Sequence, residues 1–272
     1  MSEELAGIAL DVARAAAELV RGRAARGVAV ADTKTSATDV VTEADRASET
    51  LIRGMLRERR PDDAFLGEEG DDETGTSGVR WIIDPIDGTV NFLYGLPAYA
   101  VSIAAERDGE VVAGVVLNAA SGTEYVAHLG PDGAGVATRD GTPVGVRAPV
   151  PLSQRLVSTG FSYDPGLRAI QARAMVNLLP RVRDIRRIGS SALDLCNVGE
   201  GAVDAYVEEG VHYWDHAAGA LVARIGGART ELTRGAGGRD LMICAPAHGF
   251  DEFRDAVREA GFLAESGAVS GE

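Results

Sequence analysis

Two aspartates stand close together at the end of an apolar run in the segment WIIDPIDGTVNF, residues 81–92. The run Trp81–Ile83 predicts a buried strand, and this strand would deliver Asp84 and Asp87 to the same end of a sheet. Carboxylates that close together repel each other, and a positive group is usually needed to hold them. We therefore expect a cation beside this pair.

Two further acidic positions stand out by their context. Glu68 lies in LGEEG, where an apolar strand stops at a glycine, and Asp215 lies in HYWDHAAG, between aromatic residues and a helix of small residues. Each alone has a structural explanation, a solvated turn for the first and a helix N-cap for the second. With the aspartate pair they form a set of oxygen ligands without thiolates, and this set favours Mg²⁺ over zinc.

The residues after the aspartates add a place for phosphate. Pro85 stiffens the backbone between the two carboxylates, and Gly88-Thr89 predict the start of a helix. Exposed amides at a helix start bind phosphate directly. Carboxylates that hold metal ions beside such amides are typical of metal-assisted phosphoryl hydrolysis.

Hydrophobic periodicity predicts the elements of the first half. Apolar residues at helical spacing predict a first helix, with Ser2 as its N-cap and Gly27 as its stop. A second helix should begin near Thr42 and end before Pro61. Residues 99–130 predict a β-meander, because runs rich in Val, Ala and Tyr alternate with Asp-Gly and Ser-Gly turns.

The character of the chain changes near Pro149–Pro151. From there strands alternate with helices, up to a closing helix over residues 250–260. This pattern predicts an N-terminal α+β half (residues 1–148) that carries the metal motifs and an α/β half (residues 149–265) that completes the site. Residues 266–272 are expected to form a disordered tail.

Composition excludes some classes of function. The 272 residues carry a formal net charge of −14, which argues against a nucleic-acid binder. An acidic protein also repels an anionic substrate unless metal ions reverse the local sign. The N-terminus is acidic and periodic, so neither a membrane span nor an export signal is expected. With two separate cysteines in apolar surroundings, the chain is expected to be cytoplasmic.

The motifs GEE, WIIDPIDGTVNF and WDHAAG, in this order and spacing, resemble the inositol monophosphatase family of Mg²⁺-dependent, lithium-sensitive phosphatases. The resemblance runs from the first helix to about Phe262. It implies a layered α-β-α-β-α sandwich and a homodimer. It also implies a small phosphate ester as the partner, with no nucleic acid and no membrane.

The resemblance assigns the metal ligands residue by residue. Glu68 corresponds to the glutamate that binds the activating metal, and Asp84 to the aspartate that bridges two metals. The backbone carbonyl of Ile86 would reach the first metal. Asp87 and Asp215 correspond to ligands of the second metal.

The same comparison assigns residues to catalysis. Thr89 and Glu68 would orient and deprotonate the attacking water. The segment DTKTSATDVVTEAD resembles the family's flap, whose Lys34 and Asp45 are linked to an additional Mg²⁺ and to water activation. From the residues alone, Asp45 also has a simple structural explanation, because it stands three residues after Thr42 and would favour a helix N-terminus.

On the substrate side, Gly88 and Thr89 would present amides to the phosphate. Glu208 falls where the family places a carboxylate that holds substrate hydroxyls, and serine stands in RIGSSA where relatives often carry small apolar residues. The resemblance thus implies the following substrate-binding set: Asp87, Gly88, Thr89, Gly189, Ser190, Ser191, Glu208 and Asp215.

The continuation VNF after DPIDGT is similar to the inositol monophosphatase branch, so myo-inositol-1-phosphate is the expected substrate. Fructose 1,6-bisphosphate, histidinol phosphate and nucleotide bisphosphates are the alternatives within the superfamily. A metal-dependent regulatory binding protein is the non-enzyme alternative. It would be expected to have lost at least one of the catalytic positions, and all of them are present.

Overall fold

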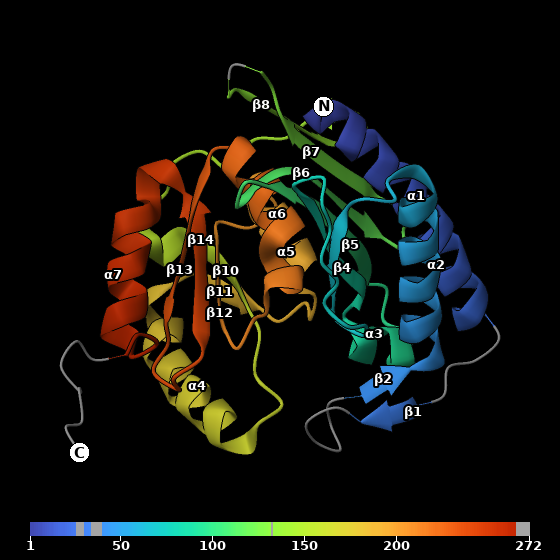
Figure 1. Cartoon of the computed structure of the whole chain (residues 1–272). Coiled ribbons are helices and arrows are strands. Elements are labelled where there is room, and N and C mark those ends of the chain that lie inside the picture. Colours follow the sequence, from blue (N-terminus) through green and yellow to red (C-terminus); the bar gives the residue numbers. More distant parts are fainter. Residues whose placement is uncertain (26–29, 34–39, 132, 265–272) are drawn as a thin grey trace, which may run out of the picture.

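The computed structural model describes residues 1–25, 30–33, 40–131 and 133–264, with only the backbone of 30–33, 40 and 41. Gly27, Lys34 and the predicted tail 266–272 lie outside the described residues. Two sheets and three layers of helices alternate as an α-β-α-β-α sandwich, which confirms the predicted fold class (Figure 1). Within the described ranges, no helix is both long enough and apolar enough to cross a bilayer.

The first outer layer consists of α1 (Ser2–Ala24) and α2 (Glu43–Arg59), which pack on the first sheet. The buried face of α1 is rich in alanine, so its backbone can lie close to β5 and β6. The predicted N-cap is wrong by one residue. Met1 precedes the helix without a side-chain cap, and Ser2 is already helical because Glu3 and Glu4 supply favourable charge in the first turn.

The first sheet has seven strands in sequential order, and it is antiparallel except for the parallel pair β3 and β4. The meander predicted for residues 99–130 is confirmed as β5, β6 and β7. The strands are β3 (Ala64–Gly67), β4 (Val79–Asp87), β5 (Ala100–Arg107), β6 (Glu110–Asn118), β7 (Glu124–Leu129), β8 (Gly135–Arg139) and β9 (Thr142–Pro143). A short hairpin, β1 (Val30–Thr33) and β2 (Val40–Thr42), precedes α2.

The middle layer is formed by α5 (Ser191–Gly199) and α6 (Tyr213–Ile225), which contact both sheets. Both helices are apolar on nearly every side because they have a sheet on each face. Small residues let them approach closely: a Cβ at Gly114 of β6 would lie 3.0 Å from the Cα of Ala218.

The second sheet has five strands in the order β11-β10-β12-β14-β13, covered on its outer face by α4 (Pro165–Leu178) and α7 (Phe250–Ala260). Strands β10, β11 and β12 are parallel, and β13 and β14 are antiparallel. The strands are β10 (Leu156–Thr159), β11 (Asp184–Arg186), β12 (Ala205–Glu209), β13 (Ala228–Arg234) and β14 (Asp240–Pro246). The sequence analysis missed the edge strands β11 and β13.

The chain passes from the first sheet to the second between Pro143 and Leu156, where the boundary at residue 149 was predicted. Three short 3₁₀ helices complete the connections: η1 (Leu152–Gln154), η2 (Leu179–Arg181) and η3 (Ala247–Gly249). Because α5 and α6 share buried clusters with both sheets, the two halves enclose a common middle layer. That each half is a separate domain stays a prediction.

Candidate active site

The end of β4 bends at the segment DPID. Asp84 pairs with Ser102 and Asp87 with Ala100 on β5, so β4 carries one extra residue and forms a bulge. A bulge bends a strand and redirects its side chains. The backbone N–H of Ile86 donates to Asp84 Oδ1 at 3.1 Å, which fixes the first carboxylate inside the bend.

Gly88 turns the chain from β4 into the short helix α3 (Thr89–Tyr94). Its φ of 97° lies in the left-handed region, and a Cβ there would lie 2.9 Å from the carbonyl oxygen of Ala98. Only glycine fits this position. The turn makes Thr89 the first helical residue, as predicted.

Asp45 and Thr89 meet at this turn. The capping box of α2 is present, with Asp45 Oδ2 accepting from the N–H of Thr42 at 2.8 Å. Its other oxygen, Oδ1, accepts from Thr89 Oγ1 at 3.0 Å, and the carbonyl oxygen of Ile86 lies 3.1 Å from the same hydroxyl. Asp45 therefore caps a helix and also holds the threonine that was predicted to orient water.

Glu68 is placed beside Asp84 by the pairing of two strands. Since β3 runs parallel to β4, their carboxyl ends lie at the same edge, and the N–H of Glu68 donates to the carbonyl of Ile83 at 3.2 Å. The residue after the end of β3 thus lies next to the aspartate pair.

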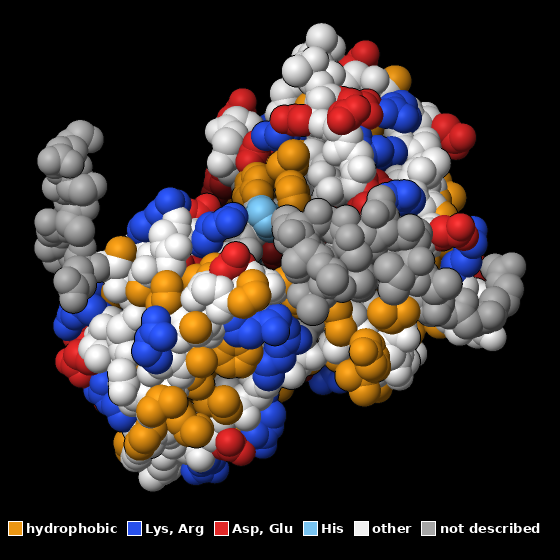
Figure 2. All heavy atoms as spheres, turned by 90° about the horizontal axis from the view of Figure 1, so that it is seen from below, with side chains coloured by type: hydrophobic (Ala, Val, Ile, Leu, Met, Phe, Trp, Pro, Cys, Tyr) orange, Lys and Arg blue, Asp and Glu red, His pale blue; other side chains and the backbone are white. Residues whose placement is uncertain are grey.

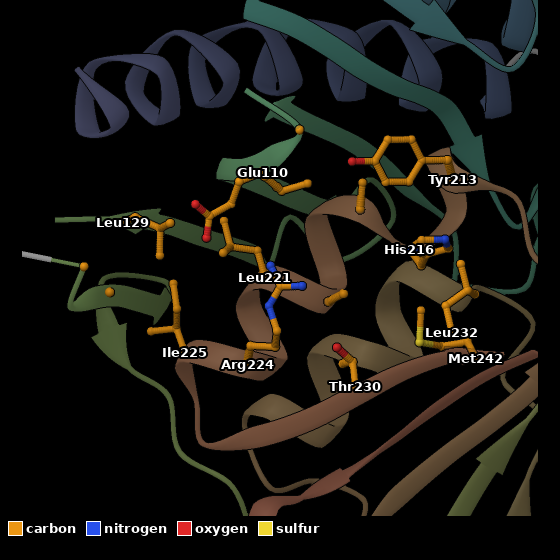
Figure 3. A pocket seen from close by; sticks show the side chains of 16 residues that line it. Glu110, Leu129, Tyr213, His216, Leu221, Arg224, Ile225, Thr230, Leu232 and Met242 are labelled. Carbon is orange, nitrogen blue, oxygen red and sulfur yellow. The ribbon is translucent and has the colours of Figure 1, made fainter. Parts of the chain in front are cut away.

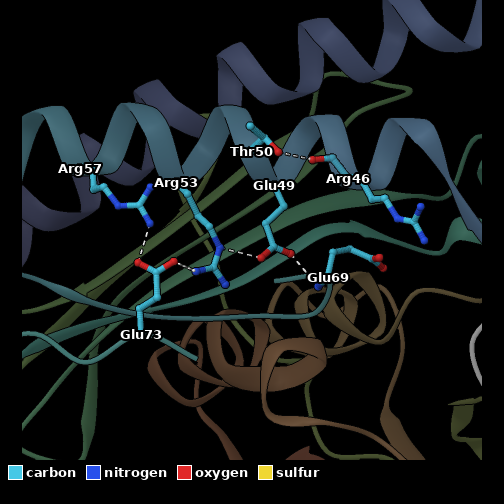
Figure 4. A network of polar contacts seen from close by, with 7 residues as sticks. All are labelled: Arg46, Glu49, Thr50, Arg53, Arg57, Glu69 and Glu73. Carbon is cyan, nitrogen blue, oxygen red and sulfur yellow. Dashed lines mark hydrogen bonds and ion pairs between the residues drawn. The ribbon is translucent and has the colours of Figure 1, made fainter. Parts of the chain in front are cut away.

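A network that the sequence analysis missed supports the Glu68 loop from α2 (Figure 4). Glu49 Oε2 accepts from the N–H of Glu69 at 2.8 Å, and Glu49 Oε1 accepts from Arg53 Nε at 2.7 Å. Arg53 also donates to Glu73 Oε1 at 2.8 Å. A Cβ at Gly67 would lie 2.1 Å from Glu49 Oε1, so the GEEG loop closes directly over this carboxylate.

Asp87 is held by the start of α5. Asp87 Oδ2 accepts from Ser190 Oγ at 2.6 Å and from the N–H of Ala192 at 2.7 Å. Burial raises the pKa of Asp87 to about 6, although these hydrogen bonds favour the ionised form. Ser190 is the N-cap of α5 and is only 2% exposed. Its hydroxyl makes its hydrogen bonds within the protein, to Asp87 and to the N–H of Leu193.

Asp215 lies in the first turn of α6, where its Oδ2 accepts from the N–H of His212 at 2.6 Å. Burial raises its pKa well above the ordinary value, and the charges of Asp87 and Glu68 raise it further. Asp87 and Glu68 are therefore close enough to Asp215 to oppose its ionisation. His212 stacks on Trp214 with ring centroids 4.9 Å apart.

The predicted polyol residues lie around α5 and β12. Burial raises the pKa of the half-buried Glu208 to about 7. Glu208 Oε2 accepts from the hydroxyl of Tyr206 at 2.9 Å, and that hydroxyl lies 2.7 Å from Ser191 Oγ. Gly189 precedes α5 with a φ of 94°.

A cavity of about 460 Å³ brings most of the predicted residues together. From the predicted set it is lined by Glu68, Asp84, Ile86, Asp87, Gly88, Thr89, Gly189, Ser191, Glu208 and Asp215. Asp45 and Ser190 lie behind this lining. Within the described part of the chain, no three acidic, imidazole or thiol side chains converge tightly enough to enclose an ion. The carboxylates surround the cavity instead of closing on one point.

Two arginines that the sequence analysis did not assign also line this cavity, Arg187 and Arg239. The charge of Arg187 lowers the pKa of both Asp87 and Glu208, so it lies near the carboxylates. Arg187 belongs to the basic run RVRDIRRIG, and this run was the feature of the sequence that could have indicated a basic residue near the site. On the face seen from below, basic side chains gather beside apolar ones on the lower lobe, so the negative net charge is unevenly spread (Figure 2).

A second cavity of about 650 Å³ lies along α6 and contains none of the predicted residues (Figure 3). Arg224 and Leu221 of α6 face Glu110 and Leu129 of the first sheet across it. Met242 of the second sheet also lines this cavity. The candidate active site is therefore the smaller of the two cavities.

Comparison with known proteins agrees with this geometry. A family model described as "Inositol monophosphatase family" matches residues 1–256. The chain belongs to the inositol monophosphatase family. This membership identifies it as a hydrolase of the phosphatase type, and the family is generally metal-dependent.

Individual relatives span nearly the whole chain. Inositol-1-monophosphatase SuhB of Mycobacterium tuberculosis is 46% identical over 93% of both chains. A protein of Pasteurella multocida named Nus factor SuhB is 38% identical, over 81% of this chain and 82% of its own. The crystal structure of extragenic suppressor protein suhB from Bartonella henselae superposes with a TM-score of 0.85 at 30% identity, covering 94% of this chain and 99% of the other.

Proposed function

We propose that this member of the inositol monophosphatase family is a Mg²⁺-dependent phosphomonoesterase that releases phosphate from myo-inositol-1-phosphate. The observation that carries the proposal is the cavity in which the four carboxylates predicted as metal ligands and Thr89 meet Glu208. The carboxylates suit metal-assisted phosphoryl transfer, and Glu208 suits hydroxyl groups. The name of the mycobacterial relative supports the choice of substrate.

The donor set fits Mg²⁺. Every predicted ligand offers oxygen: the carboxylates of Glu68, Asp84, Asp87 and Asp215 and the carbonyl of Ile86, and Mg²⁺ prefers such hard donors. The cation would also stabilise the ionised form of Asp215, whose pKa is raised by burial and by the charges of Asp87 and Glu68. When bound, Mg²⁺ supplies positive charge to the phosphate and lowers the pKa of a coordinated water.

The chain's own residues then position and deprotonate the attacking water. Thr89 shares its single hydroxyl proton with Asp45 and the carbonyl of Ile86, so its lone pairs are left to accept a hydrogen bond from water. Glu68 takes a proton from that water as the water oxygen attacks phosphorus. The ester P–O bond breaks, and the departing oxygen takes up a proton from a water in the cavity, which regains one from Glu68. The products are inositol and inorganic phosphate.

One observation favours a second candidate substrate. Arg187 and Arg239 both line the cavity, and arginine is well suited to bind phosphate. A sugar bisphosphate such as fructose 1,6-bisphosphate would place its second phosphate near these side chains. The monophosphate is preferred because Glu208, which lines the same cavity, is better suited to bind a hydroxyl group than a second phosphate.

The test is phosphate release with Mg²⁺ from inositol-1-phosphate, histidinol phosphate, fructose 1,6-bisphosphate and a nucleotide bisphosphate. We expect inositol-1-phosphate to give the highest kcat/KM. Glu68→Gln should abolish turnover, whereas Asp71→Asn, an exposed change in the same loop, should not. Release from none of these esters would contradict the proposal and favour a regulatory binding role. The name Nus factor borne by the Pasteurella relative makes that role the alternative to test.

The cellular compartment and the oligomeric state are also proposals. Cys196 and Cys244 are buried free thiols, which supports a reducing compartment such as the cytoplasm. We infer a homodimer from the family resemblance, and light scattering coupled to size-exclusion chromatography would measure it. A mass of 28.3 kDa, that of a single chain, would contradict the dimer.

A further inference from the structure

The carboxylate of Glu208 is held by two residues that no sequence pattern singled out, Tyr206 and Gly160. Tyr206 and Glu208 are two positions apart on β12, so their side chains point to the same face of the second sheet. The Tyr206 hydroxyl donates to Glu208 Oε2 at 2.9 Å. Tyr206 is fully buried, so its hydroxyl is fixed by packing as well as by this hydrogen bond.

The direction of the hydrogen bonds follows from the count of protons. Because the single proton of the Tyr206 hydroxyl goes to Glu208, the 2.7 Å contact with Ser191 Oγ requires Ser191 to donate. The chain of hydrogen bonds therefore runs from Ser191 through Tyr206 to Glu208. It ends on Oε2 and leaves Oε1 of Glu208 for a ligand.

Gly160 closes the other side of the carboxylate. β10 pairs with β12 in parallel, with Ser158 opposite Tyr206 and Thr159 opposite Val207, so the next residue, Gly160, lies beside Glu208. A Cβ at Gly160 would lie 2.0 Å from Glu208 Oε2 and 2.1 Å from its Cδ. The Glu208 carboxylate thus occupies the place that any side chain at residue 160 would need.

We propose that Gly160 and Tyr206 are positioning residues that fix the Glu208 carboxylate for substrate hydroxyls and so set the preference for polyol phosphates. This inference rests on the proposed function. Asp87, one of the proposed metal ligands, has its own support, because its Oδ2 accepts from the Ser190 hydroxyl and the N–H of Ala192 and not from Tyr206. Loss of the Tyr206 hydroxyl should therefore act on hydroxyl recognition and leave the phosphate end in place.

The experiment is steady-state kinetics of Tyr206→Phe with inositol-1-phosphate and with p-nitrophenyl phosphate, which has no ring hydroxyls. Phenylalanine keeps the buried ring and removes only the hydroxyl. We expect KM for inositol-1-phosphate to rise about tenfold, the lower end for a hydrogen bond to a charged group, with a much smaller change for p-nitrophenyl phosphate. Equal changes for both esters, or none, would overturn the proposal.

A matched control is Tyr125→Phe, which also removes a buried tyrosine hydroxyl that donates to a glutamate, Glu200, outside the cavity. It should leave both KM values unchanged. The double variant Tyr206→Phe/Glu208→Gln should be no worse than Glu208→Gln alone, because Tyr206 acts through Glu208. Additive losses would show that it does not.

A structural measurement separates this inference from the proposed function. In crystal structures of Tyr206→Phe and Gly160→Ala, the Glu208 carboxylate should be displaced from its position beside residue 160. An unmoved carboxylate in both variants overturns the positioning role whatever the substrate is. Wild-type protein that releases no phosphate from inositol-1-phosphate overturns the proposed function, while the displacement still decides the positioning role.

Discussion

Thr89 Oγ1 and Asp45 Oδ1, from residues 44 positions apart, are joined by a hydrogen bond of 3.0 Å. Asp45 also closes the capping box of α2, so one carboxylate fixes both the start of a helix and the hydroxyl of Thr89 beside the proposed metal ligands. Asp45 is fully buried, so bulk water does not compete for these hydrogen bonds. The two explanations of Asp45 offered by the sequence, structural and catalytic, are therefore compatible.

The first prediction concerns this hydroxyl. Thr89→Ala should lower kcat by about a hundredfold or more with little change in KM, because orienting the water matters mainly in the transition state. Thr89→Ser keeps the hydroxyl and should retain most of the activity. The measurement is steady-state kinetics of both variants on inositol-1-phosphate. If serine proves as poor as alanine, the methyl group and not the hydroxyl is what matters.

The second prediction concerns the metal. Activity should vanish in chelator and return with added Mg²⁺, because the four proposed ligand carboxylates in the cavity need a cation to bind an anionic phosphate. Excess Ca²⁺ should inhibit, since it accepts longer bonds and looser geometry than Mg²⁺. Phosphate release across a series of metal concentrations measures this. Full turnover in chelator would refute the ligand assignment.

A third prediction separates stability from activity at Asp87. Its carboxyl is buried and raises the pKa of Asp215, so the two charges destabilise the metal-free protein. Asp87→Asn keeps an oxygen to accept from Ser190 and Ala192 and removes the charge. In chelator it should melt at the wild-type temperature or higher, and it should gain less on adding Mg²⁺.

Calorimetric melting of both proteins, with and without Mg²⁺, measures the two shifts. Asp71→Asn is the control, because it removes one charge from an exposed position away from the cavity. Equal Mg²⁺-induced shifts in wild type and Asp87→Asn would show that Asp87 is not a ligand.

The sequence predicts the parts of the site that depend on local chemistry. Two aspartates after an apolar run, followed by Gly88-Thr89, indicate a strand that turns into a helix, and the structure has this turn. Glu49 could not be predicted, because its role depends on a loop twenty residues further along the chain that closes over it. A glutamate on a charged helix normally predicts a solvated face.

The same reasoning explains the missed strands. β11 is three residues long and carries two charges, Asp184 and Arg186, and three of the seven residues of β13 are charged. Both lie at sheet edges, where burial is incomplete and the hydrophobic pattern is weak. The sequence shows Tyr206 two positions before Glu208, but the space left by Gly160 required the register of β10 against β12.

A fourth prediction follows from the Glu208 pKa. Its carboxyl has a pKa of about 7 in the folded metal-free protein, against an ordinary value near 4.5. Between these two pH values Glu208 keeps its proton in the folded state but has lost it in the unfolded state. The contribution of Glu208 to the free energy of unfolding is therefore full at low pH and is lost as the pH rises towards 7. In chelator, the free energy of unfolding should therefore fall between about pH 4.5 and about pH 7.

Glu208→Gln should show a shallower fall over the same range, because it lacks the titrating group. Asp87 shifts in the same direction, so only the difference between wild type and variant isolates Glu208. Urea unfolding at several pH values measures it, with Glu110→Gln, an exposed change on β6, as the control. Parallel curves for wild type and Glu208→Gln would contradict the assignment.

The last prediction concerns the buried ion pair beneath the Glu68 loop. The side chains of Glu49 and Arg53 are 3% and 8% exposed, and they meet at 2.7 Å. Removing one partner of a buried pair leaves the other charge without compensation, at a cost of about 3–5 kcal/mol. Glu49→Gln should lower the free energy of unfolding by this order and should also lower kcat, because the N–H of Glu69 loses a charged acceptor next to Glu68.

Arg57→Gln is the matched control, because Arg57 stands one turn along α2 and pairs with Glu73 at a half-exposed position. A pair of that kind contributes about 0–1 kcal/mol, so this variant should keep nearly wild-type stability and kcat. Urea unfolding and steady-state kinetics on both variants give the comparison. If Glu49→Gln loses stability but keeps its kcat, the network supports the fold without placing Glu68. A loss in both quantities shows that α2 holds Glu68, the proposed metal ligand, in position through the backbone N–H of Glu69.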